Sequence, residues 1–153
     1  MTAPAAGLDT PAELVAAART VLDRPDALPG PAWARSTALL ARQALEAALA
    51  EFWRREVPDE VTGSFTTQLL CLRSYVPTEV ATGAFEAWAA LSTACHHHAY
   101  DLAPTAAELH NWVDAVATLV TALGPGAPPP PAAGAGGGEQ AGGDGAPTDV
   151  GPA

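Results

Sequence analysis

Apolar residues recur at helical spacing along most of this chain, and that pattern restricts it to an all-α fold. Residues 105–123 show the pattern most clearly, with Leu109, Val113 and Val116 three or four positions apart. No segment alternates apolar and β-branched residues with polar ones at the period of two that a half-buried strand requires. We therefore predict an antiparallel bundle of about five helices joined by short loops.

Helix start and stop signals indicate where these helices begin and end. Thr10 with Glu13, and Thr105 with Glu108, each have the spacing of a capping box, in which each side chain accepts a hydrogen bond from the other residue's backbone N–H. Prolines and glycines separate the periodic segments. The predicted helices cover approximately residues 10–23, 31–57, 64–75, 77–101 and 105–123.

The helix predicted over residues 77–101 organises the rest of the bundle. Ala84, Trp88, Leu91 and Cys95 fall in one narrow arc of its helical wheel, and Leu102 lies close to that arc. The last turn of this predicted helix carries three consecutive histidines, at positions 96–98.

These three histidines do not form a metal site by themselves. Adjacent helical residues point about 100° apart, so His96, His97 and His98 cannot jointly bind one ion. The pairs at i,i+4 spacing are His97 with Asp101 and His96 with Tyr100, and neither resembles a zinc signature. The sequence therefore predicts no metal and no other cofactor.

Composition divides the chain into a folded domain and a tail. Residues 124–153 are rich in Gly, Pro and Ala and contain Val150 as their one large apolar residue, which predicts a disordered low-complexity tail. The helical domain is then residues 8–123. The chain carries a net charge of −10; three of its seventeen acidic residues and none of its seven basic ones lie in the tail, so the rest carries −7. Nonspecific nucleic-acid binding needs many Lys and Arg residues, and this chain has no Lys. The composition therefore disfavours a protein that binds nucleic acid electrostatically as a monomer.

The sequence also predicts where the protein resides. Residues 1–14 lack the basic and apolar regions of a signal peptide, and no stretch has the roughly 18 uninterrupted apolar residues of a membrane span. Cys71 and Cys95 both lie beside apolar residues within helical patterns. We therefore expect a cytoplasmic protein that contacts no membrane and has two buried free thiols.

The order of these segments resembles that of the HEPN domains, which are small prokaryotic helical bundles. The resemblance rests on a long helix reading ARQALEAAL, a shorter helix ending in LRSYV, and a buried helix ending in histidine and tyrosine. Many HEPN proteins are metal-independent ribonucleases with an Arg, four to six intervening residues, a His, and often a Tyr two positions after the His. His98-Ala99-Tyr100 is similar to the end of that motif, but positions 91–93 hold Leu, Ser and Thr instead of Arg.

The resemblance leaves three hypotheses for function. The first is a helical binding or regulatory module, a catalytically degenerate HEPN-like domain that forms a homodimer or binds a protein partner. The second is a divergent ribonuclease in which His98 transfers protons, Arg73 holds the phosphate and Tyr100 orients the site. Such a site could bind RNA or a nucleotide through His96, His97 and Asp101.

The third hypothesis is a metal- or pH-responsive protein built on the histidine cluster. A plainer alternative applies to His96 and His98 under all three hypotheses: they lie at the edge of the core and form hydrogen bonds with backbone carbonyls near the helix end, while His97 points to solvent. We favour the binding module, because the acidic charge and the missing arginine both weaken the ribonuclease hypothesis.

Overall fold

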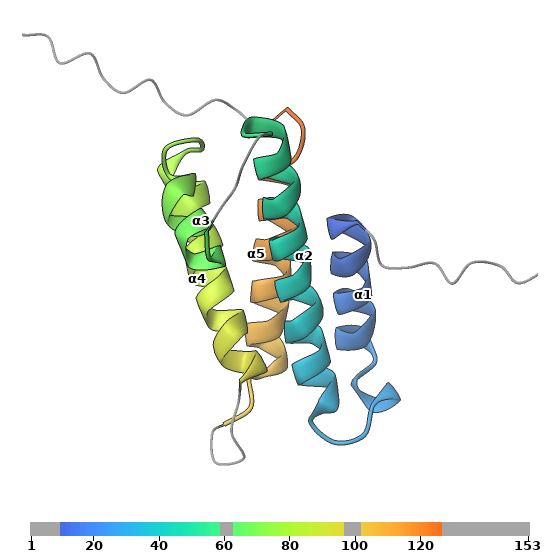
Figure 1. Cartoon of the computed structure of the whole chain (residues 1–153). Coiled ribbons are helices and arrows are strands. Elements are labelled where there is room, and N and C mark those ends of the chain that lie inside the picture. The colour runs from blue at the N-terminus through green and yellow to red at the C-terminus, as the bar shows by residue number, and fades with distance from the viewer. Residues whose placement is uncertain (1–9, 59–62, 97–101, 127–153) are drawn as a thin grey trace, which may run out of the picture.

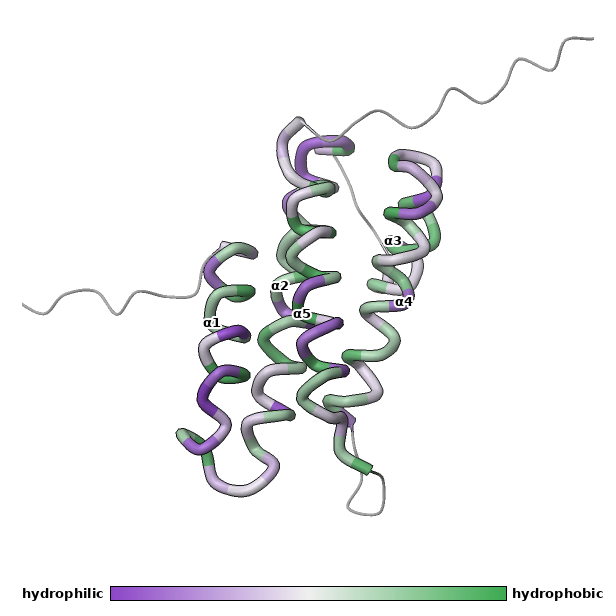
Figure 2. The backbone as a smooth tube through the Cα atoms, turned by 180° about the vertical axis from the view of Figure 1, so that it is seen from behind, coloured by the Kyte–Doolittle hydropathy of each residue, from purple (hydrophilic) through white to green (hydrophobic). Residues whose placement is uncertain are grey.

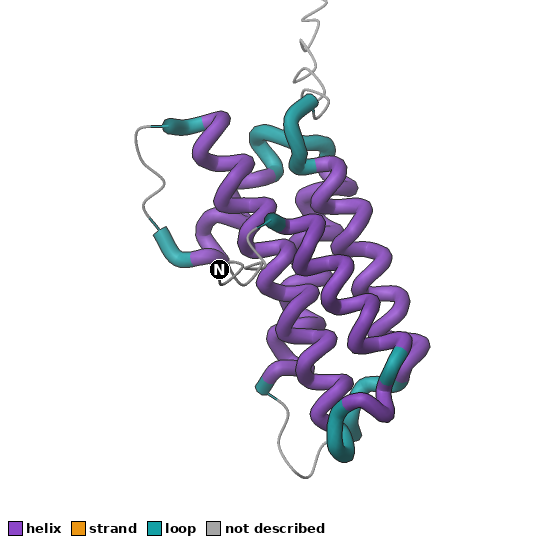
Figure 3. Tube along the Cα trace, turned by 90° about the vertical axis from the view of Figure 1, so that its right-hand side faces the viewer, coloured by secondary structure: helices purple, strands orange, loops and turns teal. Residues whose placement is uncertain are grey.

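The computed structural model confirms the all-α prediction. It describes residues 10–58, 63–96 and 102–126, and these contain five α-helices and no strand (Figures 1 and 3). The helices are α1 (Pro11–Asp23), α2 (Ala32–Glu56), α3 (Phe65–Leu72), α4 (Thr78–Cys95) and α5 (Ala106–Ala122), with a short 3₁₀ helix at Pro25–Ala27 after α1. The predicted tail lies beyond the described residues, apart from its first three.

Helices α1, α2, α4 and α5 form a four-helix bundle, and α3 lies outside it against α4 (Figure 1). The central helix is α2, which contacts α1, α4 and α5. α4 runs antiparallel to α2, so the N-terminal end of α2 lies near the C-terminal end of α4 (Figure 1). This arrangement sets the positions of two candidate sites, the surface between α3 and α4 and the C-terminal end of α4.

The core consists of the apolar stripes that the sequence pattern predicts. Figure 2 shows hydrophobic and hydrophilic residues alternating along each helix, as an amphipathic bundle requires. The predicted stripe of α4 is buried at Ala84, Leu91 and Cys95, and Trp88 is partly buried. The largest fully buried side chains come from four helices, the α3–α4 connection and the C-cap of α5: Thr37, Leu45, Leu49, Phe52, Leu72, Val76, Leu91, Leu109, Val113, Val116 and Leu123.

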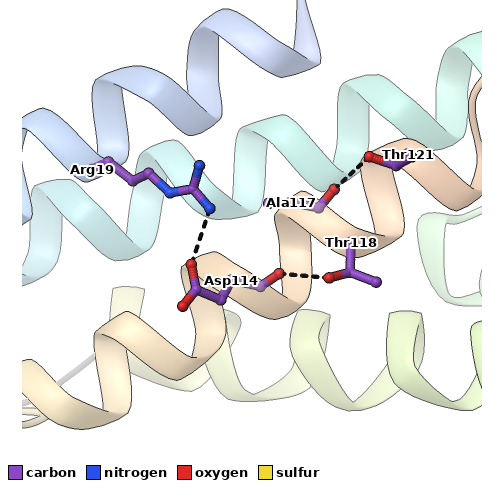
Figure 4. Close-up of polar contacts among 5 residues, drawn as sticks. All are labelled: Arg19, Asp114, Ala117, Thr118 and Thr121. Atoms are coloured by element: carbon purple, nitrogen blue, oxygen red, sulfur yellow. Dashed lines mark hydrogen bonds and ion pairs between the residues drawn. The ribbon is translucent and has the colours of Figure 1, made fainter.

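Local hydrogen bonds fix the helix starts where the sequence predicts them. Both capping boxes are present: the Thr10 hydroxyl accepts from Glu13 N, and the Thr105 hydroxyl accepts from Glu108 N, each at 3.2 Å. Arg19 of α1 donates to Asp114 of α5 at 3.0 Å, while the hydroxyls of Thr118 and Thr121 donate back to carbonyls within α5 (Figure 4). The Arg19–Asp114 pair is exposed, so it adds little to stability.

Two predicted helices are shorter in the structure. α3 ends at Leu72, and Ser74 and Tyr75 continue it as tight turns that donate to the carbonyls of Cys71 and Leu72. Pro77 limits how far these turns can continue, because a proline disfavours helical conformation at the residue before it, Val76. α4 ends at Cys95, so the prediction that the histidines occupy its last turn is wrong for His96, which is its C-cap.

Candidate functional site

His96 is exposed at the C-terminal end of α4. Its backbone N–H is shared between the carbonyls of Ser92 and Thr93, at 3.1 and 3.2 Å, which tightens the final turn. His97, His98, Tyr100 and Asp101 lie outside the described residues, so their proposed roles stay predictions. Within the described part of the chain, no three His, Cys, Asp or Glu residues are grouped closely enough to hold a metal ion.

Cys95, the neighbour of His96, is a buried thiol in an arginine-rich setting. Burial raises its pKa, and this outweighs the lowering effect of the Arg42 and Arg35 guanidinium groups on α2. Glu46 adds to the rise. Cys95 therefore stays protonated near neutral pH and is a poor nucleophile, as the sequence predicted for a core thiol.

Arg42 is held in place by an aromatic and acidic network between α2 and α4. Its Nε donates to Glu46 Oε1 at 2.7 Å, and its guanidinium lies 5.6 Å from the Trp88 ring centroid. Trp88 Nε1 donates to the same carboxylate oxygen at 3.3 Å, and the Trp88 ring packs on Phe65 of α3 with centroids 5.4 Å apart. These contacts place Arg42 near the C-terminal end of α4, which we call the histidine end. They also engage the Arg42 guanidinium, so a phosphate would have to compete with them for it.

Arg73 lies far from the histidine end of α4. It is the C-cap of α3 and lines the same groove as Ala81 and Thr82, which lie in the first half of α4. α4 has 18 residues, a length of about 27 Å, and His96 is at its far end. His98, two residues further on, can extend only about 7 Å from His96. A single chain therefore does not bring Arg73 and His96 together. The arginines whose charges act on Cys95, the neighbour of His96, are Arg42 and Arg35.

A groove lies between α3 and the first half of α4. It has a volume of about 290 Å³ and is lined by Leu69, Leu70, Arg73, Ala81, Thr82, Phe85 and Glu86. Two large apolar side chains remain open to solvent at its sides: Leu70 is 54% exposed and Phe85 is 42% exposed. We call this surface the α3–α4 groove.

A second groove lies at the other end of α4. It measures about 470 Å³ and is lined by residues that include Ala90, Thr93, Leu102 and Trp112. Leu102 is 98% exposed, so the prediction that it lies beside the buried stripe is wrong. It follows the end of α4 by seven residues and does not continue that helix.

Sequence reasoning missed the α3–α4 groove, although a signal for it exists. Phe85 lies off the Ala84–Leu91 arc of α4, and Leu70 and Cys71 follow buried Leu69 in an apolar run. α3 and α4 therefore carry more large apolar residues than their buried faces can cover, and the extra ones lie at the surface. Cys71 is exposed, which corrects the prediction of two buried thiols.

Comparisons with known proteins add no relative. No family model, no curated protein and no solved structure matches this chain. Among the helices that the structure describes, none combines the length and apolar character needed to cross a membrane.

Proposed function

We propose that this chain is a helical binding module that acts through the α3–α4 groove, and that it is a catalytically degenerate HEPN-like domain. The observation that carries this proposal is the exposure of Leu70 and Phe85 on either side of one groove. Full burial of such a side chain contributes about 1.5–3 kcal/mol, so covering both favours association. The occupant is a protein surface, either a second copy of the chain or a partner.

Three features support binding rather than catalysis. Positions 91–93 lack the motif arginine, and Arg73 lines the groove at the opposite end of α4 from His96. Cys95 is protonated and buried, so it does not supply a nucleophile instead.

Capture experiments on single-residue variants test the binding role. The tagged wild-type chain should retain a defined set of proteins, and the untagged chain is one of the candidates assayed. The tagged Leu70→Glu variant should no longer retain these proteins. Leu39→Glu is the matched control, because Leu39 is 46% exposed on α2 and does not line the groove. Equal recovery with all three baits would contradict the proposal.

A second candidate function is RNA cleavage at the histidine end. The observation that favours it is the presence of Arg35 and Arg42 near Cys95, since in-line cleavage needs a histidine to move protons and a cation to hold phosphate. Glu46 competes for Arg42, which weakens this candidate.

Incubation with mixed RNA under chelator tests the second candidate. We expect intact RNA with the wild type and with a variant in which His96, His97 and His98 are all Ala. RNA loss in the wild type alone would establish the ribonuclease. Arg35→Ala and Arg42→Ala, compared with Arg73→Ala, would then identify the arginine that holds the phosphate.

A further inference from the structure

The α3–α4 groove carries one positive and one negative side chain around its apolar centre. Arg73 is the C-cap of α3, and Glu86 lies on α4 one position after Phe85. Both are exposed, and neither forms an ion pair with another residue in the described part of the chain. Two unpaired opposite charges therefore flank Leu70 and Phe85.

The two charges lie at different levels along the groove. α3 runs antiparallel to α4, so the end of α3 that carries Arg73 lies beside the start of α4 (Figure 1). Glu86 is eight residues after Thr78, the first residue of α4, which places it about 12 Å along the helix. Arg73 and Glu86 thus mark opposite ends of the surface, with the apolar pair between them.

This arrangement is self-complementary under a twofold axis. In an interface between two identical surfaces, residue i contacts residue j of the other copy, and j contacts i. A twofold axis through the Leu70–Phe85 centre exchanges the two ends, so each Arg73 faces the other copy's Glu86. The two apolar pairs then cover each other.

The charge balance of the groove also favours a second copy. The chain carries −10 overall, which opposes self-association through most of its surface. The groove residues contribute one positive and one negative charge, so at this surface two copies meet without net repulsion. Depletion of charge at the centre, with charged residues at the rim, is also typical of protein interfaces.

We propose that the α3–α4 groove is a twofold homodimer interface in which Leu70 and Phe85 pack on their counterparts and Arg73 pairs with Glu86 of the second copy. This inference rests on the binding role proposed above and names the occupant of that surface. Because two chains associate, the fraction of dimer depends on protein concentration.

Charge reversal, followed by sedimentation over a roughly hundredfold concentration range, tests the pairing. The full-length wild type should change from 15.5 kDa monomers to dimers as concentration rises. Arg73→Glu alone and Glu86→Arg alone should each stay monomeric, because each places like charges opposite one another twice. The double variant Arg73→Glu/Glu86→Arg should dimerise again.

A mixture of the two single variants gives the sharpest result. Mixed together, Arg73→Glu and Glu86→Arg chains should form a heterodimer, since both cross-interface pairs then join opposite charges. Recovery in this mixture also shows that each variant is folded. If the wild type dimerises but neither reversal weakens it, or if the mixture stays monomeric, the twofold pairing is wrong.

The outcomes separate this inference from the binding role itself. A wild type that stays monomeric throughout the range, yet captures another protein in a Leu70-dependent manner, overturns the homodimer and leaves the binding module intact. Loss of both self-association and Leu70-dependent capture overturns both. An interface confirmed by the charge swap supports both.

Discussion

Cys71 and Cys95 are the same chemical group in opposite surroundings. Cys71 lies exposed on α3, whereas Cys95 is buried where α4 meets α2. The sequence did not distinguish them, because both follow apolar residues in helical patterns. The difference arises from packing, since α3 contacts the bundle on one side and α4 is enclosed by α2, α3 and α5.

Thiol labelling should therefore resolve the two cysteines. We expect one fast-reacting thiol in the native protein, lost in Cys71→Ser, and one slow thiol, lost in Cys95→Ser. The raised pKa and burial of Cys95 both slow its reaction at pH 7. Mass spectrometry of the labelled chain measures this, and equal native rates for the two cysteines would contradict the packing of α4.

Glu108 gives a pH-dependent prediction at the start of α5. Hydrogen bonds from the backbone N–H and hydroxyl of Thr105, both at 2.8 Å, lower the pKa of the Glu108 carboxyl. Because the folded-state pKa is lowered, the carboxylate stabilises the fold above its unfolded-state pKa and loses that effect as pH falls through the folded-state value.

Glu108→Gln should therefore lower the melting temperature at pH 7, and the difference from the wild type should shrink as pH falls below about 4, near the ordinary pKa of Glu. Paired thermal melts across this pH range measure the difference. A gap that stays constant with pH would show that the carboxylate charge does not contribute to the cap.

At the scale of the elements, the helices follow from the sequence more closely than their ends do. Periodicity and capping residues predict the first and last residues of α1, α2 and α5 to within about one residue. They extend α4 too far, because no breaker precedes Pro104. α4 instead ends after its last buried residue, Cys95, and histidines have only moderate helix propensity to prolong it.

The candidate surfaces were harder to predict than the helices, because they depend on which helices meet. Arg73 and His98 are only 25 positions apart in the sequence, which suggested that folding brings them together. In the structure, the length of α4 separates Arg73 from His96, which is two residues before His98. Arg42 approaches the histidine end because α2 runs antiparallel to α4 (Figure 1). A contact of this kind, 53 positions apart in sequence for Arg42 and Cys95, leaves no local signal.

Arg55 joins two helix ends and gives a prediction at this scale. Its Nη2 donates at 2.6 Å to the carbonyl of Leu123, just after α5, where backbone carbonyls lack helical partners. Arg55→Ala should lower the free energy of unfolding by about 1 kcal/mol. Arg54→Ala, at the exposed neighbouring position, should change it by less than about 0.5 kcal/mol.

Urea denaturation of the two variants measures this difference. A loss of equal size in both would show that the charge of the α2 end matters rather than the bond to Leu123. No loss in either would mean that water satisfies the carbonyl equally well.

At the scale of the whole molecule, α3 is the helix with the fewest neighbours. α1, α2, α4 and α5 form the four-helix bundle, and α3 packs on it mainly through α4, burying Leu69 and Leu72 against the core. A short helix with few neighbours opens locally more readily than the core helices do. α3 forms one side of the α3–α4 groove. A surface bound in this groove would therefore stabilise α3 more than any other helix.

Amide hydrogen exchange at low and high protein concentration tests the role of the α3–α4 groove most directly. Exchange should slow at high concentration in peptides covering residues 65–86, and it should stay unchanged in α1 and α5, which do not line the groove. Exchange that does not depend on concentration anywhere, or that slows only around Trp112 in the other groove of α4, would contradict the proposed interface.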